Sequence, residues 1–412
     1  MKMYEQNPQF QAAAKICQTL EAHGHQAWLA GGCVRDFLLQ RVPNDFDIAT
    51  SAKPDQIEAL FPRTVAVGKN FGVIVVVDDQ IQTEVATFRL DGLYQDGRRP
   101  EGVVFASPEE DALRRDFTVN AMFYDLKKDE VVDFVGGIED LKQGQLKAVG
   151  DPLLRFEEDH LRLLRCVRLS AQLEFEIEEK TWAAVVQQAK SVQTVSGERI
   201  QEELSKLLMA GNSGGFQAKV FERLFRSGIL SALVKHDGLC WIPAESFFVR
   251  RVLLKEDLWF RFFLWIQQLA TASGGLSLWF FESLCEQWKF SRELKQKVLK
   301  SLHWMFEDDS LAQHSLGELI ELSYDPDQMR GLVEYAEHLS KKPEQDLWRQ
   351  MLERRKHLGA FRPGPLVQAR DLMDRGVRGE NLGKALKWCY HRQLEGLANS
   401  ASELLLRWQE LK

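Results

Sequence analysis

The chain has 412 residues and a formal net charge of −7, with 27% charged and 45% hydrophobic residues, which predicts a globular protein of two to four domains. The acidic balance taken alone disfavours a nucleic-acid partner, because phosphates are bound by a positive field. A secretory leader and a membrane partner are not expected, since no apolar run opens the chain and the most apolar stretch, residues 258–266, is too short to span a bilayer, so we expect a cytoplasmic protein.

Residues 27–150 have the pattern of a mixed α/β domain. A short strand at residues 28–30 leads through a Gly-Gly turn into a helix at residues 34–39. Stretches rich in Val, Ile and Thr predict three further strands, and Asp78 and Asp79 form a hairpin turn between the last two. These three strands are expected at residues 46–49, 73–77 and 81–88.

From about residue 152 onward the strand signals fade and apolar residues recur at helical spacing. Leu161, Leu164 and Val167 form one such series. The aromatic residues between positions 241 and 290 also follow helical spacing beside many leucines, which predicts a helical core and not an RNA-stacking surface. We therefore expect a helical remainder with linkers at residues 211–215 and 361–365.

Isolated polar motifs outside these patterns indicate no further site. The six cysteines are far apart and have no zinc-binding spacing, which predicts free, buried thiols in a reducing compartment. His236 and Asp237 lack the additional ligands of a phosphohydrolase and are interpreted as a surface loop. Between residues 341 and 392, basic residues outnumber acidic ones by about two to one, so this segment could hold RNA on an acidic protein.

The densest group of motifs lies in residues 29–50, LAGGCVRDFLLQRVPNDFDIAT. Gly31 and Gly32 fall between a predicted strand and a helix N-terminus, where free N–H groups attract anions. Arg35 follows one turn later, where its guanidinium could fork onto a phosphate. Asp45 and Asp47 are two residues apart in an extended segment, so their side chains leave the same face of the chain.

Paired carboxylates such as Asp45 and Asp47 repel each other unless a cation lies between them. Hard oxygen ligands without His or Cys favour Mg²⁺. Glu84, in a later predicted strand, could complete a two-metal centre that activates an attacking hydroxyl and stabilises a leaving pyrophosphate. The alternative is a polar loop of surface acids.

A second cluster, RRDFTVN at residues 114–120, combines adjacent arginines with an acid and an amide. These groups suit a triphosphate and a ribose. Alternatively, the arginines pair with nearby acids on the preceding segment, namely Glu109, Glu110 and Asp111.

A third cluster, EDHLRLLRCVR at residues 158–168, places Asp159 and Arg162 three apart on a predicted helix, with Arg165 and Arg168 continuing the stripe. One interpretation is an intrahelical salt bridge. The other is nucleobase recognition, because cytosine and adenine both present an amino donor beside a ring-nitrogen acceptor. Asp159 can accept from the amino group and Arg162 can donate to the ring nitrogen, whereas guanine and uracil would leave both side chains mispaired.

The motif order GGCVRD…DFD, RRDFTVNA, EDHLRLLR and SGERIQEEL resembles the class II tRNA nucleotidyltransferases, or CCA-adding enzymes, whose superfamily includes bacterial poly(A) polymerases. The resemblance covers about residues 27–205 and extends weakly to ARDLMDRGV and LGKAL near the C-terminus. It implies an α+β fold class: a polymerase-β-like head with a small mixed sheet, then an all-α neck, body and tail. The implied domains are residues 1–152, 153–213, 214–340 and 341–412 respectively.

The resemblance also implies roles for individual residues. Asp45 and Asp47 would hold the metals, with Mg²⁺ as cofactor. Gly32, Arg35 and Arg115 would contact the nucleotide. Asp159 and Arg162 would recognise the base. The last two residues of the stripe would lie near the triphosphate or support that pair, and these are Arg165 and Arg168.

Three other segments match features of the family. Residues 133–137, DFVGG, match the hinge between head and neck. Residues 196–199 match a motif that braces the neck, although Ser196 could alternatively serve only as a helix N-cap. Residues 89–103 resemble the flexible loop that family members need to add the final A. Residues 67–72, VGKNFG, lack the more basic stretch of poly(A) polymerases.

The expected activity is addition of CCA to tRNA from CTP and ATP, without an obligate protein partner. Addition of the terminal A alone, a poly(A) polymerase and a catalytically inactive RNA-binding protein remain the alternatives. In the basic tail, candidates for tRNA phosphate contacts are Arg354, Arg355, Lys356, Arg370, Arg375 and Arg378.

Overall fold

The computed structural model describes residue 4 and residues 6–91, 103–209, 214–240, 255–270, 276–306, 314–337, 342–359 and 361–410. The chain divides into two compact units, Met1–Arg251 and Val252–Lys412. The predicted four-part division, with boundaries after residues 152, 213 and 340, is finer than these two units and stays a prediction. Within the described ranges, no helix has both the length and the apolar character that crossing a membrane requires.

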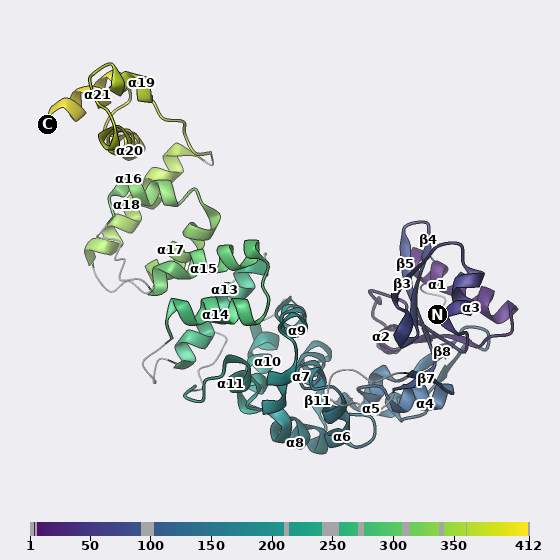
Figure 1. Ribbon diagram of the computed structural model, residues 1–412. Helices are drawn as coiled ribbons and strands as arrows, with labels where there is room; N and C mark the ends of the chain where they lie inside the picture. The colour runs from purple at the N-terminus through teal and green to yellow at the C-terminus, as the bar shows by residue number, and fades with distance from the viewer. Residues whose placement is uncertain are drawn as a thin grey trace. The chain divides into compact units, whose positions relative to one another are not determined.

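A seven-stranded mixed sheet organises the N-terminal part of the first unit (Figure 1). In spatial order it contains β3 (Thr64–Gly68), β4 (Val73–Asp78), β5 (Ile81–Thr87), β2 (Ile48–Thr50), β1 (Ala27–Ala30), β8 (Phe123–Asp125) and β9 (Glu130–Val132). Only the β2–β5 pair in this sheet is parallel. The β4–β5 hairpin turns at Asp79 and Gln80, with a left-handed φ of 53° at Asp79, so the predicted hairpin is confirmed but its turn lies one residue later, because Asp78 still pairs with Ile81.

Two small two-stranded sheets accompany the main one. β6 (Arg89–Asp91) pairs antiparallel with β7 (Val103–Phe105), and β10 (Gln145–Leu146) pairs parallel with β11 (Glu176–Ile177). β11 is an exception to the predicted absence of strands after residue 152. β2 begins at Ile48, two residues later than predicted, although the Asp47 carbonyl still accepts from the Ala30 N–H at 2.9 Å.

The described helices of the first unit fall into two groups along the chain. The first group is α1 (Pro8–Ala22), α2 (Gly32–Leu38), α3 (Pro54–Leu60), η2 (Lys69–Phe71), α4 (Pro108–Leu113), η3 (Thr118–Asn120) and α5 (Gly137–Gln143). The second is α6 (Pro152–Glu158), α7 (Leu161–Leu173), α8 (Glu179–Gln188), η4 (Ala189–Thr194), α9 (Gly197–Met209), α10 (Gly214–Arg226) and α11 (Ile229–Val234). Helix α10 begins inside the predicted linker at 211–215, of which residues 211–213 lie outside the described part.

The main sheet has an aromatic core on one face. Trp28, Phe88 and Phe123 are buried, and each pair of ring centroids is 5.8 or 5.9 Å apart. Each ring comes from a different strand or strand end, so their packing ties the strands together.

Helix α7 carries the predicted apolar series, and its Leu164 and Val167 side chains are fully buried.

The second unit contains helices joined by irregular segments, with no strand among its described residues (Figure 1). It contains α13 (Lys255–Ala270), α14 (Leu278–Gln287), α15 (Arg292–Phe306), α16 (Leu316–Leu322), α17 (Pro326–Glu337), α18 (Lys342–Leu358), α19 (Ala369–Met373), α20 (Glu380–Glu395) and α21 (Ala401–Glu410). The predicted linker at 361–365 is the irregular segment between α18 and α19.

The aromatic residues of α13 and α14 form a core, as predicted for their described part. Trp259 and Trp288 are fully buried, and the Trp259 ring lies 4.7 Å from that of Phe290, centroid to centroid. Trp279 is an exception, because it is 74% exposed. Residues 241–254 and 271–275 of the predicted aromatic segment lie outside the described residues.

The thiols and the His236-Asp237 pair behave largely as expected. Five of the six cysteines are buried and all six are free, while Cys240 is exposed, which contradicts the prediction for that one residue. His236 and Asp237 follow the end of α11 in irregular backbone, so they form a loop.

Candidate active site

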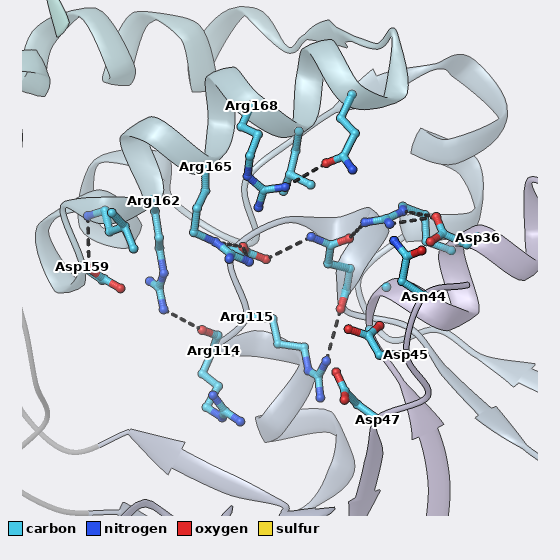
Figure 2. Close-up of a pocket in the computed structure, with 18 of the residues that line it drawn as sticks. Asp36, Asn44, Asp45, Asp47, Arg114, Arg115, Asp159, Arg162, Arg165 and Arg168 are labelled. Atoms are coloured by element: carbon cyan, nitrogen blue, oxygen red, sulfur yellow. Dashed lines mark hydrogen bonds and ion pairs between the residues drawn. The ribbon is translucent and has the colours of Figure 1, made fainter. Parts of the chain in front are cut away.

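A cavity of about 580 Å³ in the first unit collects residues from all three sequence clusters (Figure 2). The turn into α2 and the segment before β2 contribute glycines and carboxylates, the segment after α4 contributes arginines, and α7 and α9 contribute the remaining basic residues. Its lining consists of Gly31, Gly32, Arg35, Asp36, Asn44, Asp45, Asp47, Arg114, Arg115, Asp116, Asn120, Asp159, Leu161, Arg162, Arg165, Arg168, Leu169, Gln172 and Arg199.

Asp45 and Asp47 lie together in this cavity because Phe46 between them points the other way. Phe46 is 4% exposed and packs edge-on against Phe10, with centroids 5.6 Å apart. The alternation of an extended chain then turns both carboxylates to the opposite side, where Figure 2 shows them next to each other. Burial and repulsion from Asp45 and Glu84 raise the pKa of Asp47 to about 7, although Arg115 opposes the rise.

Glu84 lies beside this pair but does not line the cavity. The parallel register sets Ile48 opposite Val85, which places Asp47 level with Glu84 on the neighbouring strand. The Glu84 side chain is exposed. Within the described residues, no three His, Cys, Asp or Glu side chains come close enough to form a complete metal centre. A metal ligand role for Glu84 therefore stays a prediction.

The Gly-Gly turn brings the backbone close to Arg115. Gly31 has φ 75° and ψ −128°, which side chains avoid, and a Cβ there would lie 3.2 Å from Nη1 of Arg115. Gly32 begins α2 and lines the cavity. Arg35 is buried, and its guanidinium donates to Asn120 Oδ1 at 2.6 Å and to Asp36 Oδ1 at 2.9 and 2.7 Å.

The two arginines after α4 pair with one acid, as the alternative interpretation anticipated. Asp111 is 1% exposed and lies 2.6 Å from Arg114 Nη2 and 3.0 Å from Arg115 Nη2. Glu110 instead caps its own helix by accepting from the Ser107 backbone N–H at 2.8 Å. Both arginines nevertheless line the cavity, so pairing with Asp111 and a place at the nucleotide site are not exclusive.

Asp159 and Arg162 do not share a helix, which corrects the predicted geometry. Helix α6 ends at Glu158, Asp159 has extended backbone with φ −147°, and α7 begins at Leu161. Arg199 on α9 donates to both oxygens of Asp159 at 3.1 and 2.7 Å. Arg162 instead lies 2.6 Å from Glu158, so the proposed intrahelical bridge between Asp159 and Arg162 is absent in the described structure. Both side chains line the cavity all the same.

Arg165 and Arg168 point from α7 toward the same space (Figure 2). Arg165 Nη2 lies 2.5 Å from Asp116 Oδ2. Burial alone would raise the pKa of Asp116, but the ion pair with Arg165 outweighs burial and lowers that pKa to about 2. Arg168 pairs with the buried Glu203 of α9 and donates to Gln172 at 2.8 Å. The Asp116–Arg165 pair therefore joins the segment after α4 to helix α7.

All seven described arginines of the cavity have an acidic partner. A bound anion must therefore use their remaining N–H groups or exchange a partner, since each guanidinium carries five donors. The pairs are Arg35–Asp36, Arg114–Asp111, Arg115–Asp111, Arg162–Glu158, Arg165–Asp116, Arg168–Glu203 and Arg199–Asp159.

Several cavity residues were not predicted as site residues. Asp116 and Asn120 belong to the RRDFTVN motif, which signalled them as a group without separate roles. Gln172 lies one helical turn after Arg168, so extending the stripe along α7 would have found it. Asp36 ends the GGCVRD motif and Asn44 directly precedes Asp45, but neither was assigned a role of its own.

The mixed sheet, the Asp45–Asp47 pair and the arginine-lined cavity define the class of a nucleotidyltransferase. Residues 27–147 match the family model described as the poly A polymerase head domain, and residues 174–236 match a probable RNA and SrmB-binding site of polymerase A.

Curated and solved CCA-adding enzymes are similar over most of the chain. The enzyme of Anoxybacillus flavithermus is 37% identical over 76% of this chain and 76% of its own. The enzyme of Enterococcus faecalis is 36% identical over 77% of each chain. The crystal structure of the Bacillus stearothermophilus CCA-adding enzyme in complex with CTP has 28% identity, a TM-score of 0.76 and 98% coverage of both chains. The chain therefore belongs to the class II CCA-adding enzyme family.

Proposed function

We propose that this protein adds the 3′-terminal CCA to tRNA from CTP and ATP without a template and releases diphosphate. The observation that carries this proposal is that one cavity holds both the Asp45–Asp47 pair and the Asp159 and Arg162 side chains. Its volume of about 580 Å³ lies in the range of small-molecule sites. The crystallised relative from Bacillus stearothermophilus, which contains CTP, supports a nucleoside triphosphate as the ligand.

Asp45 and Asp47 are proposed to hold Mg²⁺. Their donor set fits this ion, because both ligands are carboxylates and the repulsion that raises the pKa of Asp47 is relieved by a cation. Mg²⁺ commonly keeps waters and substrate phosphates beside one or two protein carboxylates, which agrees with a pair in place of a complete protein cage. Bound metal would supply activation of the tRNA 3′-hydroxyl and stabilisation of the leaving diphosphate.

Asp159 and Arg162 are proposed to recognise the base while each keeps its protein partner. A carboxylate has about four acceptor sites, so Asp159 can accept from a cytosine or adenine amino group while Arg199 still holds it. Arg162 is positioned by Glu158 and by the carbonyls of Arg155 and Arg114, at 2.8 and 3.1 Å. A guanine or uracil in the same place would meet a donor with a donor and an acceptor with an acceptor.

The triphosphate is proposed to lie among the remaining cavity donors. These come from Gly32, Arg35, Arg115, Arg165 and Arg168, which line the same space. We further propose that residues 1–152, 153–213, 214–340 and 341–412 are the head, neck, body and tail, and that the basic tail contacts tRNA. The predicted loop at 89–103 lies outside the described residues except at its two ends.

The activity is tested with purified protein, Mg²⁺ and three labelled tRNAs that end before CCA, after C and after CC. Each is supplied with CTP, ATP or both, and products are resolved on a sequencing gel. Extension of all three to CCA, followed by arrest, is the expected result. Addition of a single A to the CC-ended tRNA alone, or a long ladder of A, would overturn the proposal in favour of an A-adding enzyme or a poly(A) polymerase.

A further inference from the structure

Asp111 is a buried carboxylate that does not line the cavity and that none of the roles above uses. It lies in helix α4 with its side chain 1% exposed. Its Oδ1 accepts from Nε and Nη2 of Arg114 at 2.9 and 2.6 Å. Its Oδ2 accepts from Nε of Arg115 at 3.1 Å and lies 3.0 Å from Nη2. One carboxylate thus holds two adjacent guanidinium groups by their sides.

The same carboxylate is anchored to the backbone of a neighbouring strand. Its Oδ1 also accepts the N–H of Arg89 at 3.2 Å, and Arg114 Nε donates to the Arg89 carbonyl at 2.9 Å. Asp111 and Arg114 therefore bind the backbone N–H and the backbone carbonyl of Arg89, the first residue of β6. This arrangement restricts rotation of the Arg114 side chain more than an isolated ion pair would.

Arg115, held by Asp111, faces the catalytic end of the cavity next to Asp47 (Figure 2). Arg115 donates Nη1 to the Asn120 carbonyl at 3.2 Å and lies 4.8 Å over the Phe123 ring. Its charge also acts on Asp47, where it opposes part of the rise in pKa that burial and the neighbouring acids cause. The backbone carbonyl of Arg114 accepts from Arg162 Nη2 at 3.1 Å, which links the same turn to the base-recognition residue.

A purely structural role does not account for this geometry. Both arginine side chains remain 17% exposed, and both line the cavity. A buried ion pair is commonly no more stabilising than packed apolar residues, so stability alone gives little reason to bury an acid here. A fixed carboxylate behind the Arg115 guanidinium instead leaves its remaining N–H donors pointing in a set direction.

We infer that Asp111 is a positioning residue that fixes Arg114 against β6 and orients Arg115 toward the triphosphate of the incoming nucleotide. This inference rests on the proposed function, because it takes CTP and ATP as the ligands of the cavity. The Asp111 carboxylate accepts from Arg114, Arg115 and the Arg89 backbone N–H, and it does not line the cavity, so its effect on the nucleotide passes through the arginines. It does not depend on which base is bound, so both nucleotides are affected alike.

The test measures CTP and ATP binding with Mg²⁺ and without tRNA, for the full chain and two variants. Asp111→Asn should weaken both affinities about tenfold, the effect of one charge-assisted hydrogen bond, and raise KM for both nucleotides similarly. KM for tRNA should stay unchanged. Asp111→Glu keeps the charge but moves the carboxylate, so an intermediate loss is expected. The control Glu109→Gln, exposed on the same helix, should bind both nucleotides like the parent.

A double-mutant cycle separates positioning from loss of folded protein. In an Arg115→Ala background, Asp111→Asn should weaken binding less than about threefold, because the arginine through which it acts on the nucleotide is gone. A variant that merely lowers the folded fraction would reduce kcat and leave nucleotide affinity unchanged, which would overturn the inference. If Asp111→Asn does not fold, Asp111→Glu decides. If the parent binds nucleotide and the Asp111 variants bind it equally well, this inference alone is refuted. If the parent does not bind nucleotide, the proposed function is refuted as well.

Discussion

The Asp159 carboxylate is held by Arg199, which donates to its two oxygens at 3.1 and 2.7 Å from forty residues further along the chain. The partner that its sequence spacing suggested, Arg162, is held by Glu158 instead. Two separate acid–arginine pairs therefore set the positions of the proposed acceptor and donor for the nucleobase. Each can be perturbed without removing the other, which makes base selection accessible to mutation.

Replacing Arg162 by Ala should relax nucleotide selectivity. The variant loses the donor to the ring nitrogen of cytosine and adenine, so the preference for CTP and ATP over UTP and GTP should fall by about 10- to 100-fold. Competition between all four nucleotides in single-turnover extension assays measures this ratio. Dependence on Mg²⁺ concentration should remain as in the parent, and equal loss of selectivity and metal response would contradict the role.

Replacing Asp47 by Asn should remove nucleotide transfer. A metal ligand contributes more than a supporting residue, so the rate should fall by more than about 100-fold while tRNA binding persists. Rapid-quench incorporation and filter binding measure the two quantities. The same measurements on Glu84→Gln decide whether the neighbouring strand contributes a ligand, because a variant with full activity would exclude it.

The Asp116–Arg165 pair predicts a specific loss of stability in acid. The folded pKa of Asp116, about 2, lies below the ordinary value of 3.8, so the folded state binds this proton less tightly than the unfolded state. Its stabilisation is therefore present above pH 4 and is lost as the pH falls from about 4 to about 2, by at most about 2 kcal/mol. Chemical unfolding of the parent and of Asp116→Asn at several pH values measures this. The variant should lose less stability over that interval, and identical pH profiles would contradict the assignment.

Gly137, in the predicted hinge, should not tolerate a side chain. A Cβ at this position would lie 2.2 Å from the Thr118 carbonyl oxygen, so Gly137→Ala must displace backbone. We expect a loss of about 1–3 kcal/mol in unfolding free energy, measured by urea denaturation. Gly364→Ala is the control, since a Cβ there has no neighbour within 4 Å. Equal stability of the two variants would show that the contact relaxes without cost.

Neutralising the exposed arginines around α19 should weaken tRNA binding in a salt-dependent manner. Arg370, Arg375 and Arg378 are exposed, whereas Arg354 is partly buried and donates to the Leu394 carbonyl at 2.7 Å. Changing the three exposed residues to Gln should lower the slope of log affinity against log salt by about one per lost phosphate contact. Arg349→Gln, exposed on α18, is the control, and an unchanged slope in the triple variant would exclude these contacts.

Local pattern was enough to predict much of the fold and the members of the site. The strands at β1, β4 and β5, the helix α2 and the Asp79 turn follow from residue type and spacing over a few positions. The Asp45-Phe46-Asp47 alternation also follows locally, since an extended chain must send neighbouring side chains to opposite faces. The buried aromatic helices of the second unit were predictable for the same reason, because apolar periodicity determines which face is buried.

The partners within the site could not be predicted from spacing. Asp159 and Arg162 have the separation of a helical pair, but the chain breaks between α6 and α7 and brings Arg199 to Asp159. Likewise, Glu109, Glu110 and Asp111 are equivalent in sequence as partners for the two arginines, and only burial selects Asp111. A short separation in sequence shows which residues could contact each other, whereas the contacts that form depend on how other segments of the chain pack.

The sequence by itself determined the chemical inventory of this protein: a carboxylate pair, a Gly-Gly turn, an arginine stripe and the family to which their order belongs. The tertiary structure alone decided which acid holds which arginine, since Asp116 meets Arg165 and Glu203 meets Arg168 across 49 and 35 positions. The physical reason is that residue types and local periodicity are short-range properties. Ion pairing in a buried cavity depends on distance and desolvation, which exist only once the helices have packed.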